Sequence, residues 1–194
     1  MRRPPLSPTR ALRLLTPLAL ACAFAACDDD DGPEPDPAGD EEEITTVVVT
    51  MTSVDGTTEL RVSDPDGPGG DDAVITGGTL ADSTEYTVNA VFLNESEDPV
   101  EDVTEEIEEE DEEHQVFYIV GAGLNLTVEV TDQDENGNPI GLAATATTGA
   151  ASSGDLTVVL RHEPEKDAEG VSDGDIANAG GETDIEVVFP VTIE

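Results

Sequence analysis

Residues 124–146, LNLTVEVTDQDENGNPIGLAATA, give the clearest indication of the fold class. Apolar and polar residues alternate over residues 124–130 and again over residues 140–146. Alternation with a period of two places one face of a β-strand in a core and the other face in water. The Asn136-Gly137 pair between the two runs is a strong hairpin signal. The stretch therefore predicts two antiparallel strands joined by a turn.

The same alternation recurs along the rest of residues 44–194. Glycine-rich turns separate the runs, and the chain lacks the strand–helix alternation that a parallel sheet requires. This pattern predicts an all-β domain, an antiparallel immunoglobulin-like β-sandwich of about eight or nine strands, over residues 44–194. Pro190 lies inside the last run, so we expect that strand to lie at a sheet edge or to be bulged there. The further alternating segments are 47–51, 60–62, 86–92, 156–160 and 185–193.

Residues 101–115, EDVTEEIEEEDEEHQ, interrupt the strand pattern. Thr104 is a suitable N-cap, and Val103, Ile107 and His114 share one face of a helix drawn through this segment. Glutamate favours a helix, although like charges four residues apart repel each other. We therefore expect one short acidic helix that crosses between strands.

Residues 1–26 have the form of a lipoprotein signal peptide, with basic residues before a run of Ala and Leu. The apolar run is too short for a spanning helix. It ends in FAAC, residues 24–27, which resembles a bacterial lipobox. The resemblance implies cleavage before Cys27 and lipidation of its thiol. The alternatives are an ordinary signal peptide cut near Ala26 and a lipid on Cys22.

Residues 27–43 follow as a predicted acidic tether. After the cysteine they read DDDDGPEPDPAGDEEE, which offers almost no apolar surface to offset the entropy of ordering the chain. We therefore expect a disordered, charge-extended segment. An acidic run directly after a lipidated cysteine resembles the export signal of Bacteroidota surface lipoproteins. That resemblance implies the cell envelope, with the protein anchored by its lipid to the periplasmic or the surface face of the outer membrane.

The net charge of -39 restricts the partners. Beyond residue 26 the basic residues are Arg61, Arg161 and Lys166, against 46 acidic residues. Nucleic acid is excluded as a partner, and so is direct docking on an anionic lipid surface, because both need clustered Lys and Arg. Two causes of the acidity stay open. One is a surface adapted to high salt, and the other is a local gathering of carboxylates around a hard cation.

Three loops are candidate calcium sites. Calcium takes six to eight oxygen ligands, many of them from carboxylates in glycine-containing loops. The alternative for each loop is a plain turn, in which Asp and Asn side chains accept hydrogen bonds from backbone amides. The candidate ligands are Asp64, Asp66, Asp71 and Asp72 in the first loop, Asp132, Asp134 and Asn136 in the second, and Asp173 and Asp175 in the segment 173–184.

The two histidines, His114 and His162, offer a different kind of site. If the fold brings them together, two imidazoles and Glu163 would bind zinc or copper. The alternative is a half-buried histidine that is hydrogen-bonded at a strand end.

Several motifs typical of catalysis are missing from the sequence. The residues after Cys27 contain no thiol, and the chain has no P-loop and no dinucleotide-binding motif. Aromatic residues make up 3% of the chain, too few to form the stacking platforms of a glycosidase. We therefore predict that the protein is not an enzyme.

Several segments resemble a family of small acidic Bacteroidota lipoproteins, and the resemblance spans residues 44–194. Members often carry the name type 1 periplasmic binding fold superfamily protein. That name implies two doubly wound α/β lobes, whereas the period-two pattern predicts an all-β domain. The resemblance implies no activity, ligand or catalytic residue. Among the segments that carry it are ITTVVVTMT (44–52), GLNLTVEVTDQDENGNPIG (123–141) and GVSDGDIANAGGETDIEVVFPVTI (170–193).

These observations predict a non-catalytic binding or structural lipoprotein of the cell envelope, with calcium as a candidate stabilising ion. Its expected partner is an envelope protein or a polysaccharide. The alternative is a periplasmic lipoprotein that captures a solute or ligand for a transporter, which a deep apolar pocket would favour. A third hypothesis, a metal-dependent enzyme, requires His114, His162 and a carboxylate to converge.

Overall fold

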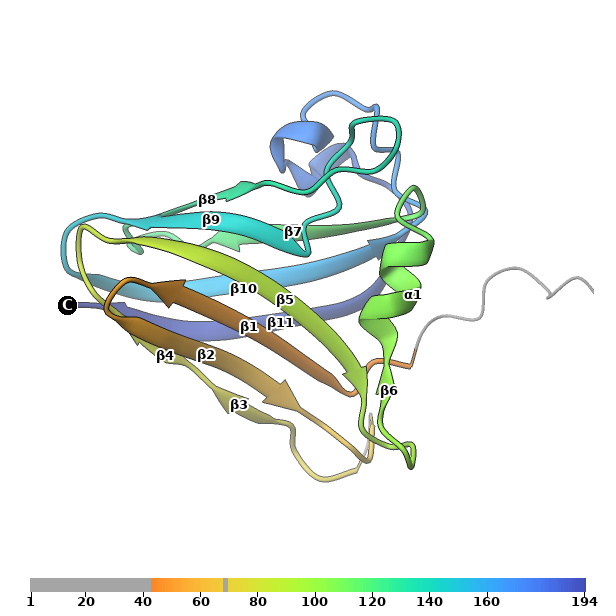
Figure 1. The fold of residues 1–194 in the computed structure, drawn as a ribbon, viewed down its shortest axis with the longest axis horizontal. Helices are drawn as coiled ribbons and strands as arrows, with labels where there is room; N and C mark the ends of the chain where they lie inside the picture. The colour runs from red at the N-terminus through yellow and green to blue at the C-terminus, as the bar shows by residue number, and fades with distance from the viewer. Residues whose placement is uncertain (1–42, 68–69) are drawn as a thin grey trace, which may run out of the picture. The chain divides into compact units, whose positions relative to one another are not determined.

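The computed structural model describes residues 43–67 and 70–194, which form two β-sheets packed face to face (Figure 1). The larger sheet has the order β3 (Val74–Thr76), β2 (Gly56–Ser63), β1 (Thr46–Ser53), β5 (Glu85–Asn94), β9 (Ala143–Thr148) and β8 (Leu126–Val130), and β6 (Glu101–Asp102) pairs with β5. The smaller sheet has the order β4 (Gly78–Leu80), β11 (Glu182–Ile193), β10 (Ser152–His162) and β7 (His114–Val120). The helical segments are α1 (Val103–Glu109) and the short 3-10 helices η1 (Val171–Asp173) and η2 (Ile176–Asn178).

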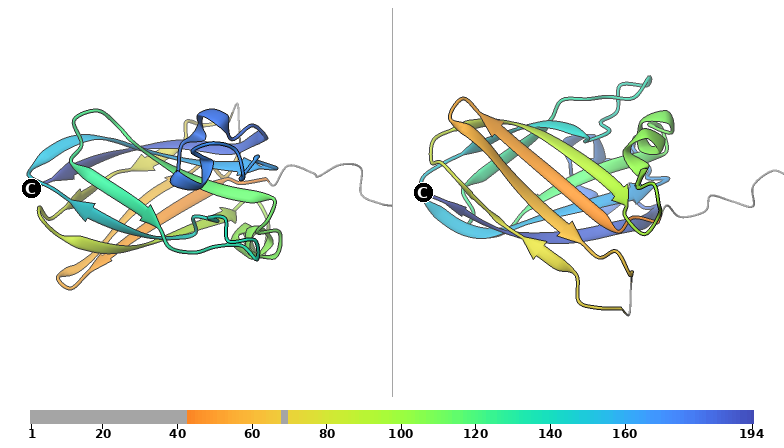
Figure 2. Two further views of the ribbon diagram at one scale, coloured as in Figure 1. Left: turned by 90° about the horizontal axis from the view of Figure 1, so that it is seen from above. Right: turned by 60° about the horizontal axis from the view of Figure 1, so that its bottom comes forward.

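The predicted all-β sandwich is confirmed, and Figure 2 shows its two layers from two further sides. The strands β3, β4 and β6 are only two or three residues long, too short for an alternating pattern to reveal them. All pairs are antiparallel except β4 with β11, which is parallel. The strand order differs from that of immunoglobulin domains, so the likeness to them lies in the architecture of two packed sheets.

The core lies between the sheets and follows the alternation of the sequence. In β5, for example, Tyr86, Val88, Ala90 and Phe92 are buried, and the residues between them are more exposed. Each fully buried Phe or Leu side chain contributes about 1.5–3 kcal/mol through removal of apolar surface from water. The largest fully buried side chains include Phe92, Phe117, Phe189, Met51 and Leu60.

Strand β7 was not predicted, because its sequence HQVFYIV lacks alternation. Val116 faces the main core between the sheets. Phe117 points to the other face, where it packs with Val159, Val171 and Ala179 beneath the segment that contains η1 and η2. A strand covered on both faces reads as a continuous apolar run, so its periodicity does not distinguish it from a helix.

The predicted acidic helix is present as α1, but its N-cap is Asp102. The Asp102 carboxylate accepts a hydrogen bond from the backbone N–H of Thr104 at 3.1 Å. Thr104, the predicted N-cap, instead uses its hydroxyl to bond the backbone of Phe92 in β5. Val103 and Ile107, which share the predicted helix face, are both buried. His114 is also buried, but it lies beyond the helix at the start of β7.

Pro190 lies in an inner strand of the smaller sheet, but it interrupts no row of hydrogen bonds between strands. The short strand β4 pairs with β11 only from Val191 onwards, so Pro190 has a strand partner on one side alone, at Asp155 of β10. The expected edge is therefore present locally, although β11 as a whole lies between β4 and β10.

The predicted signal peptide and tether, including Cys27, lie outside the described residues apart from Glu43. Within residues 43–67 and 70–194, no helix is long and apolar enough to cross a bilayer.

Candidate metal site

The register of β7 and β10 places His114 directly opposite His162. Their ring centroids are 4.7 Å apart and the ring planes are tilted by 47°. The neighbouring pair on the same face, Val116 and Leu160, belongs to the main core. The two imidazoles therefore lie at one end of the space between the sheets, where the side chains of antiparallel neighbours on one face come into contact.

Asp184 joins the histidines through a β-bulge in β11. Leu160 pairs with Ile185 and Arg161 pairs with Thr183, so Asp184 is the extra residue. Strict alternation before Ile185, which packs against the core, would place Asp184 on the outer face. The bulge redirects its side chain inwards, where it is 0% exposed. No sequence pattern marks a bulge, which is why Asp184 was not predicted as a partner of the histidines.

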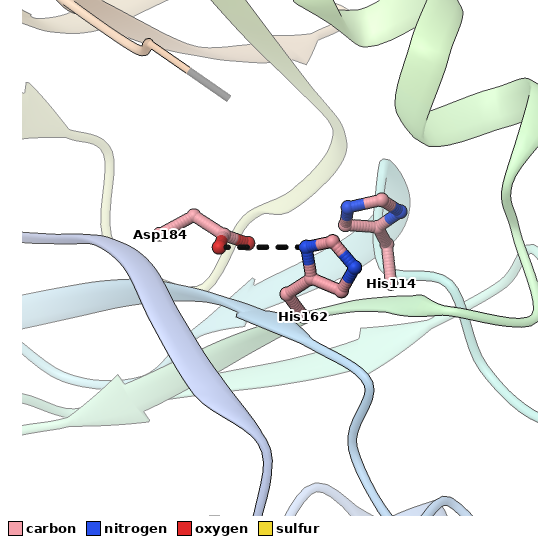
Figure 3. Close-up of side chains that lie close together, drawn as sticks. All are labelled: His114, His162 and Asp184. Atoms are coloured by element: carbon pink, nitrogen blue, oxygen red, sulfur yellow. Dashed lines mark ion pairs between the residues drawn. The ribbon is translucent and has the colours of Figure 1, made fainter. Parts of the chain in front are cut away.

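The three side chains point towards one another (Figure 3). One ligand atom of each of His114, His162 and Asp184 lies within 4.8 Å of the other two. The Asp184 Oδ1 and His162 Nδ1 atoms are 3.9 Å apart. Zinc binds nitrogen and oxygen at about 2.0–2.2 Å, so two donors on one ion lie roughly 3.4 Å apart. Small side-chain movements would therefore close the group around an ion.

His114 is oriented as metal-bound histidines generally are. Its Nδ1 lies 3.2 Å from the carbonyl oxygen of Glu110 in the turn after α1. A carbonyl only accepts hydrogen bonds, so Nδ1 carries the proton, and in the neutral ring the lone pair lies on Nε2. Metal-ligating histidines usually donate their other N–H to a group of this kind, which fixes the tautomer and the ring.

Two further carboxylates lie on the outer side of His162. The ligand atoms of Glu113, His162 and Glu163 also lie within 4.8 Å of one another. The Glu113 Oε2 and His162 Nε2 atoms are 4.0 Å apart. The backbone N–H of Glu163 donates to the carbonyl oxygen of Glu113 at 2.6 Å, which holds the two residues side by side. Glu163, the predicted carboxylate partner, thus belongs to this outer group, and Asp184 is the one that accompanies both histidines.

Lys166 holds the acidic turn against this end of the sandwich. It is the only lysine of the chain and is 5% exposed. Its Nζ donates to the carbonyl oxygen of Asp111 and, at 3.1 Å, to the carboxylate of Asp134. Burial disfavours the charged form of Asp134, but amide donors from Asn138 and Asn136 together with Lys166 outweigh it and hold the pKa of Asp134 below its ordinary value.

The candidate calcium ligands of the second loop make hydrogen bonds within the protein. Asp132 accepts from the backbone N–H groups of Gly141 and Ala143, both at 2.8 Å. Asp134 accepts from two amides of the turn, and Asn136 donates its side-chain amide to Glu112 at 2.8 Å. These contacts fit the alternative of a structural turn. Calcium at this loop stays a prediction, and the contacts disfavour it.

The other two candidate calcium loops also contain turn-forming contacts. Asp66 accepts from the backbone N–H of Asp71 at 2.7 Å, and Asp175 caps η2 by accepting from Ala177 at 2.9 Å. Asp173 is the last residue of η1. Among the described residues, only the two groups around His162 bring three His, Cys, Asp or Glu ligand atoms this close together. The remaining candidates, Asp64 and Asp72, belong to neither group.

No protein-family model, curated protein or solved structure matches the chain. The fold and the site together define an all-β sandwich that carries a histidine–carboxylate cluster at one end.

Proposed function

We propose that the protein is a non-catalytic module of the cell envelope that binds a divalent transition-metal ion through His114, His162 and Asp184. One observation carries this proposal: three different strands bring two imidazoles and a carboxylate within 4.8 Å of one another. Imidazole ligands suit zinc and copper, and two histidines with one carboxylate form a known zinc ligand set, in which a water or a substrate takes the fourth position. Calcium, which prefers six to eight oxygens, suits this set poorly.

The burial of the ligands supports binding over catalysis. His114 and the Asp184 side chain are both 0% exposed, so an ion between them would be enclosed by protein. A catalytic zinc needs an open coordination position that a substrate can reach. A hollow of about 420 Å³ beside β7 is lined by residues such as Gln115 and Phe117, and none of the three ligands lines it.

A bound ion would also stabilise the fold. It would connect β7, β10 and β11 at one end of the sandwich. An ion that binds only the folded state adds about 2.7 kcal/mol at a free concentration one hundred times its Kd. Metal binding and resistance to unfolding should therefore rise together.

We also propose that an acylated Cys27 and the acidic tether of residues 27–43 hold this module at the outer membrane, where it contacts an envelope protein or a polysaccharide. A single acyl chain gives only reversible attachment, and the several chains of a lipobox cysteine would anchor durably. A Cys27→Ser variant should lose lipid labelling and should move from the detergent phase to the aqueous phase. Membrane retention of that variant would contradict the anchor.

Zinc titration of the full chain tests the metal site. The chain should carry Cys22→Ser and Cys27→Ser, so that thiols do not bind zinc, and excess Mg²⁺ should be present to occupy exposed carboxylates. We expect calorimetry to show zinc binding and thermal unfolding to move to higher temperature. Asp184→Asn, which keeps the size of the side chain, should weaken zinc binding about tenfold or more.

Asp155→Asn is the matched control. Asp155 is exposed, lies in β10 and pairs with Pro190, far along the strand from His162. This variant makes the same change of charge and should bind zinc as the unsubstituted chain does. Absence of zinc binding, or equal losses in the two variants, would overturn the proposed function.

A further inference from the structure

We infer that His162 bridges two metal positions, the inner one with His114 and Asp184 and an outer one with Glu113 and Glu163. This inference rests on the proposed function and deepens it. It assigns a second divalent transition-metal ion to the exposed side of the ring.

The two nitrogens of His162 face different carboxylates. Nδ1 lies 3.9 Å from Asp184, and Nε2 lies 4.0 Å from Glu113. Lone pairs on the two nitrogens of an imidazole point away from each other in the ring plane, so one ring can hold two ions on opposite sides. The sharing of His162 by both ligand groups is what such a bridge requires.

The outer position differs from the inner one in exposure. The Glu113 side chain is 57% exposed and Glu163 is also exposed, whereas the Asp184 side chain is 0% exposed. The outer ligand set has two carboxylates and one imidazole, whereas the inner set has one carboxylate and two imidazoles. Softer nitrogen ligands and enclosure favour tighter binding of zinc or copper at the inner position. We therefore expect the inner position to fill first at equilibrium.

Charge balances when both positions are filled. A neutral imidazole has one lone pair, so bridging requires the ring of His162 to lose its remaining N–H proton to solvent water. The imidazolate, Asp184, Glu113 and Glu163 then supply four negative charges against two divalent cations. The coordinate bonds form without any change of oxidation state, and one proton is released from the ring.

An acidic hollow leads to the outer position. Its volume is about 510 Å³, and its lining consists of residues 108–113 and Glu135, all of them carboxylates. A concave surface with charges of one sign raises the local concentration of counter-ions. Because Glu113 belongs both to this hollow and to the outer ligand set, cations gathered in the hollow reach the Nε2 side of His162 first.

Copper titration followed by electron paramagnetic resonance tests the bridge directly. The probe is Cu²⁺ added to the full chain carrying Cys22→Ser and Cys27→Ser, with excess Mg²⁺. The first equivalent should give the signal of an isolated ion. The second equivalent should reduce the integrated signal below the copper content, because two ions joined by one imidazolate couple magnetically. Calorimetry in buffers of different ionisation enthalpy should show the extra proton released with the second equivalent.

A Glu113→Gln/Glu163→Gln double variant should bind one equivalent, keep the isolated signal and lose the coupling. The control is Glu108→Gln/Glu109→Gln, which removes two carboxylates from the hollow without touching the outer ligand set and should keep two coupled equivalents. One equivalent in the unsubstituted chain, or two equivalents without coupling, would overturn the bridge and leave the inner site standing. Absence of any bound copper and zinc would overturn both proposals.

Discussion

His114 and His162 are directly opposed residues of adjacent antiparallel strands, and their ring centroids are 4.7 Å apart. Such a pair has two interpretations. One is a metal site completed by Asp184, and the other is a structural pair of histidines hydrogen-bonded at the strand ends. The contact between His114 and Glu110 is compatible with both. A variant that keeps an aromatic ring and removes the ligand atoms separates them.

We predict that His114→Phe abolishes the rise in unfolding temperature that zinc causes. The variant still has an aromatic ring at this position but no nitrogen lone pair that can bind a metal ion. Thermal unfolding with and without zinc measures this. Tyr118→Phe is the control, since Tyr118 lies on the same face of β7 and donates to the carbonyl oxygen of Gly141 at 2.8 Å. It should lose about 1 kcal/mol for that hydrogen bond and keep the full effect of zinc. A zinc effect that persists in His114→Phe would favour the structural interpretation.

The buried ion pair of Lys166 and Asp134 predicts a large loss of stability for Lys166→Met. The substitution leaves the Asp134 carboxylate, whose side chain is 1% exposed, without its cationic partner. Breaking a buried pair in this way costs about 3–5 kcal/mol. Arg61→Met is the comparison, because the pair of Arg61 with Glu95 is partly exposed, at 32% and 26%. Urea unfolding should show that Arg61→Met lowers the free energy of unfolding by less than about 1 kcal/mol. Equal losses in the two variants would refute the distinction between the buried and the partly exposed ion pair.

Acid should destabilise the protein partly through Asp134. Its pKa is lowered in the folded state, so the unfolded chain binds this proton more readily. The resulting stability is therefore present above about pH 4, the ordinary range for Asp, and is lost as the pH falls through the lowered folded-state value. Urea unfolding should show that the free energy of unfolding falls less steeply with decreasing pH in Asp134→Asn than in the unsubstituted protein, when each is compared with its own value at neutral pH. Unchanged slopes in the two proteins would contradict the prediction.

The close approach of Gly181 to the backbone of His162 predicts that a substitution at Gly181 disturbs the metal site. Gly181 has a φ of +64°, and a Cβ there would lie 2.2 Å from the carbonyl oxygen of His162. Gly181→Ala should therefore displace the end of β10, destabilise the fold and weaken zinc binding. Gly137→Ala, at a φ of +89° with nothing within 4 Å of the added Cβ, should cost only about 1–2 kcal/mol and leave zinc binding unchanged. Equal zinc affinities in the two variants would show that Gly181 has no such role.

Much of the fold was predictable because alternation reports burial on one face. The hairpin around Asn136 and Gly137 joins β8 to β9 as predicted, and Gly137 has the positive φ that the turn needs. Strand β7 was missed for the opposite reason, since both of its faces are covered and its residues do not alternate. The helix was predicted, but its N-cap was assigned to Thr104, because sequence alone does not show which of two neighbouring caps faces the open N–H groups.

The all-β class, the short acidic helix and the residue types from which a metal site could be made follow from local patterns in the sequence. Which of those residues meet depends on the three-dimensional fold. His114 and His162 are 48 positions apart and become neighbours through strand register, which depends on the packing of the whole sheet. Asp184 joins them because a single extra residue in β11 reverses the direction of its side chain, and no local pattern of residues encodes that reversal.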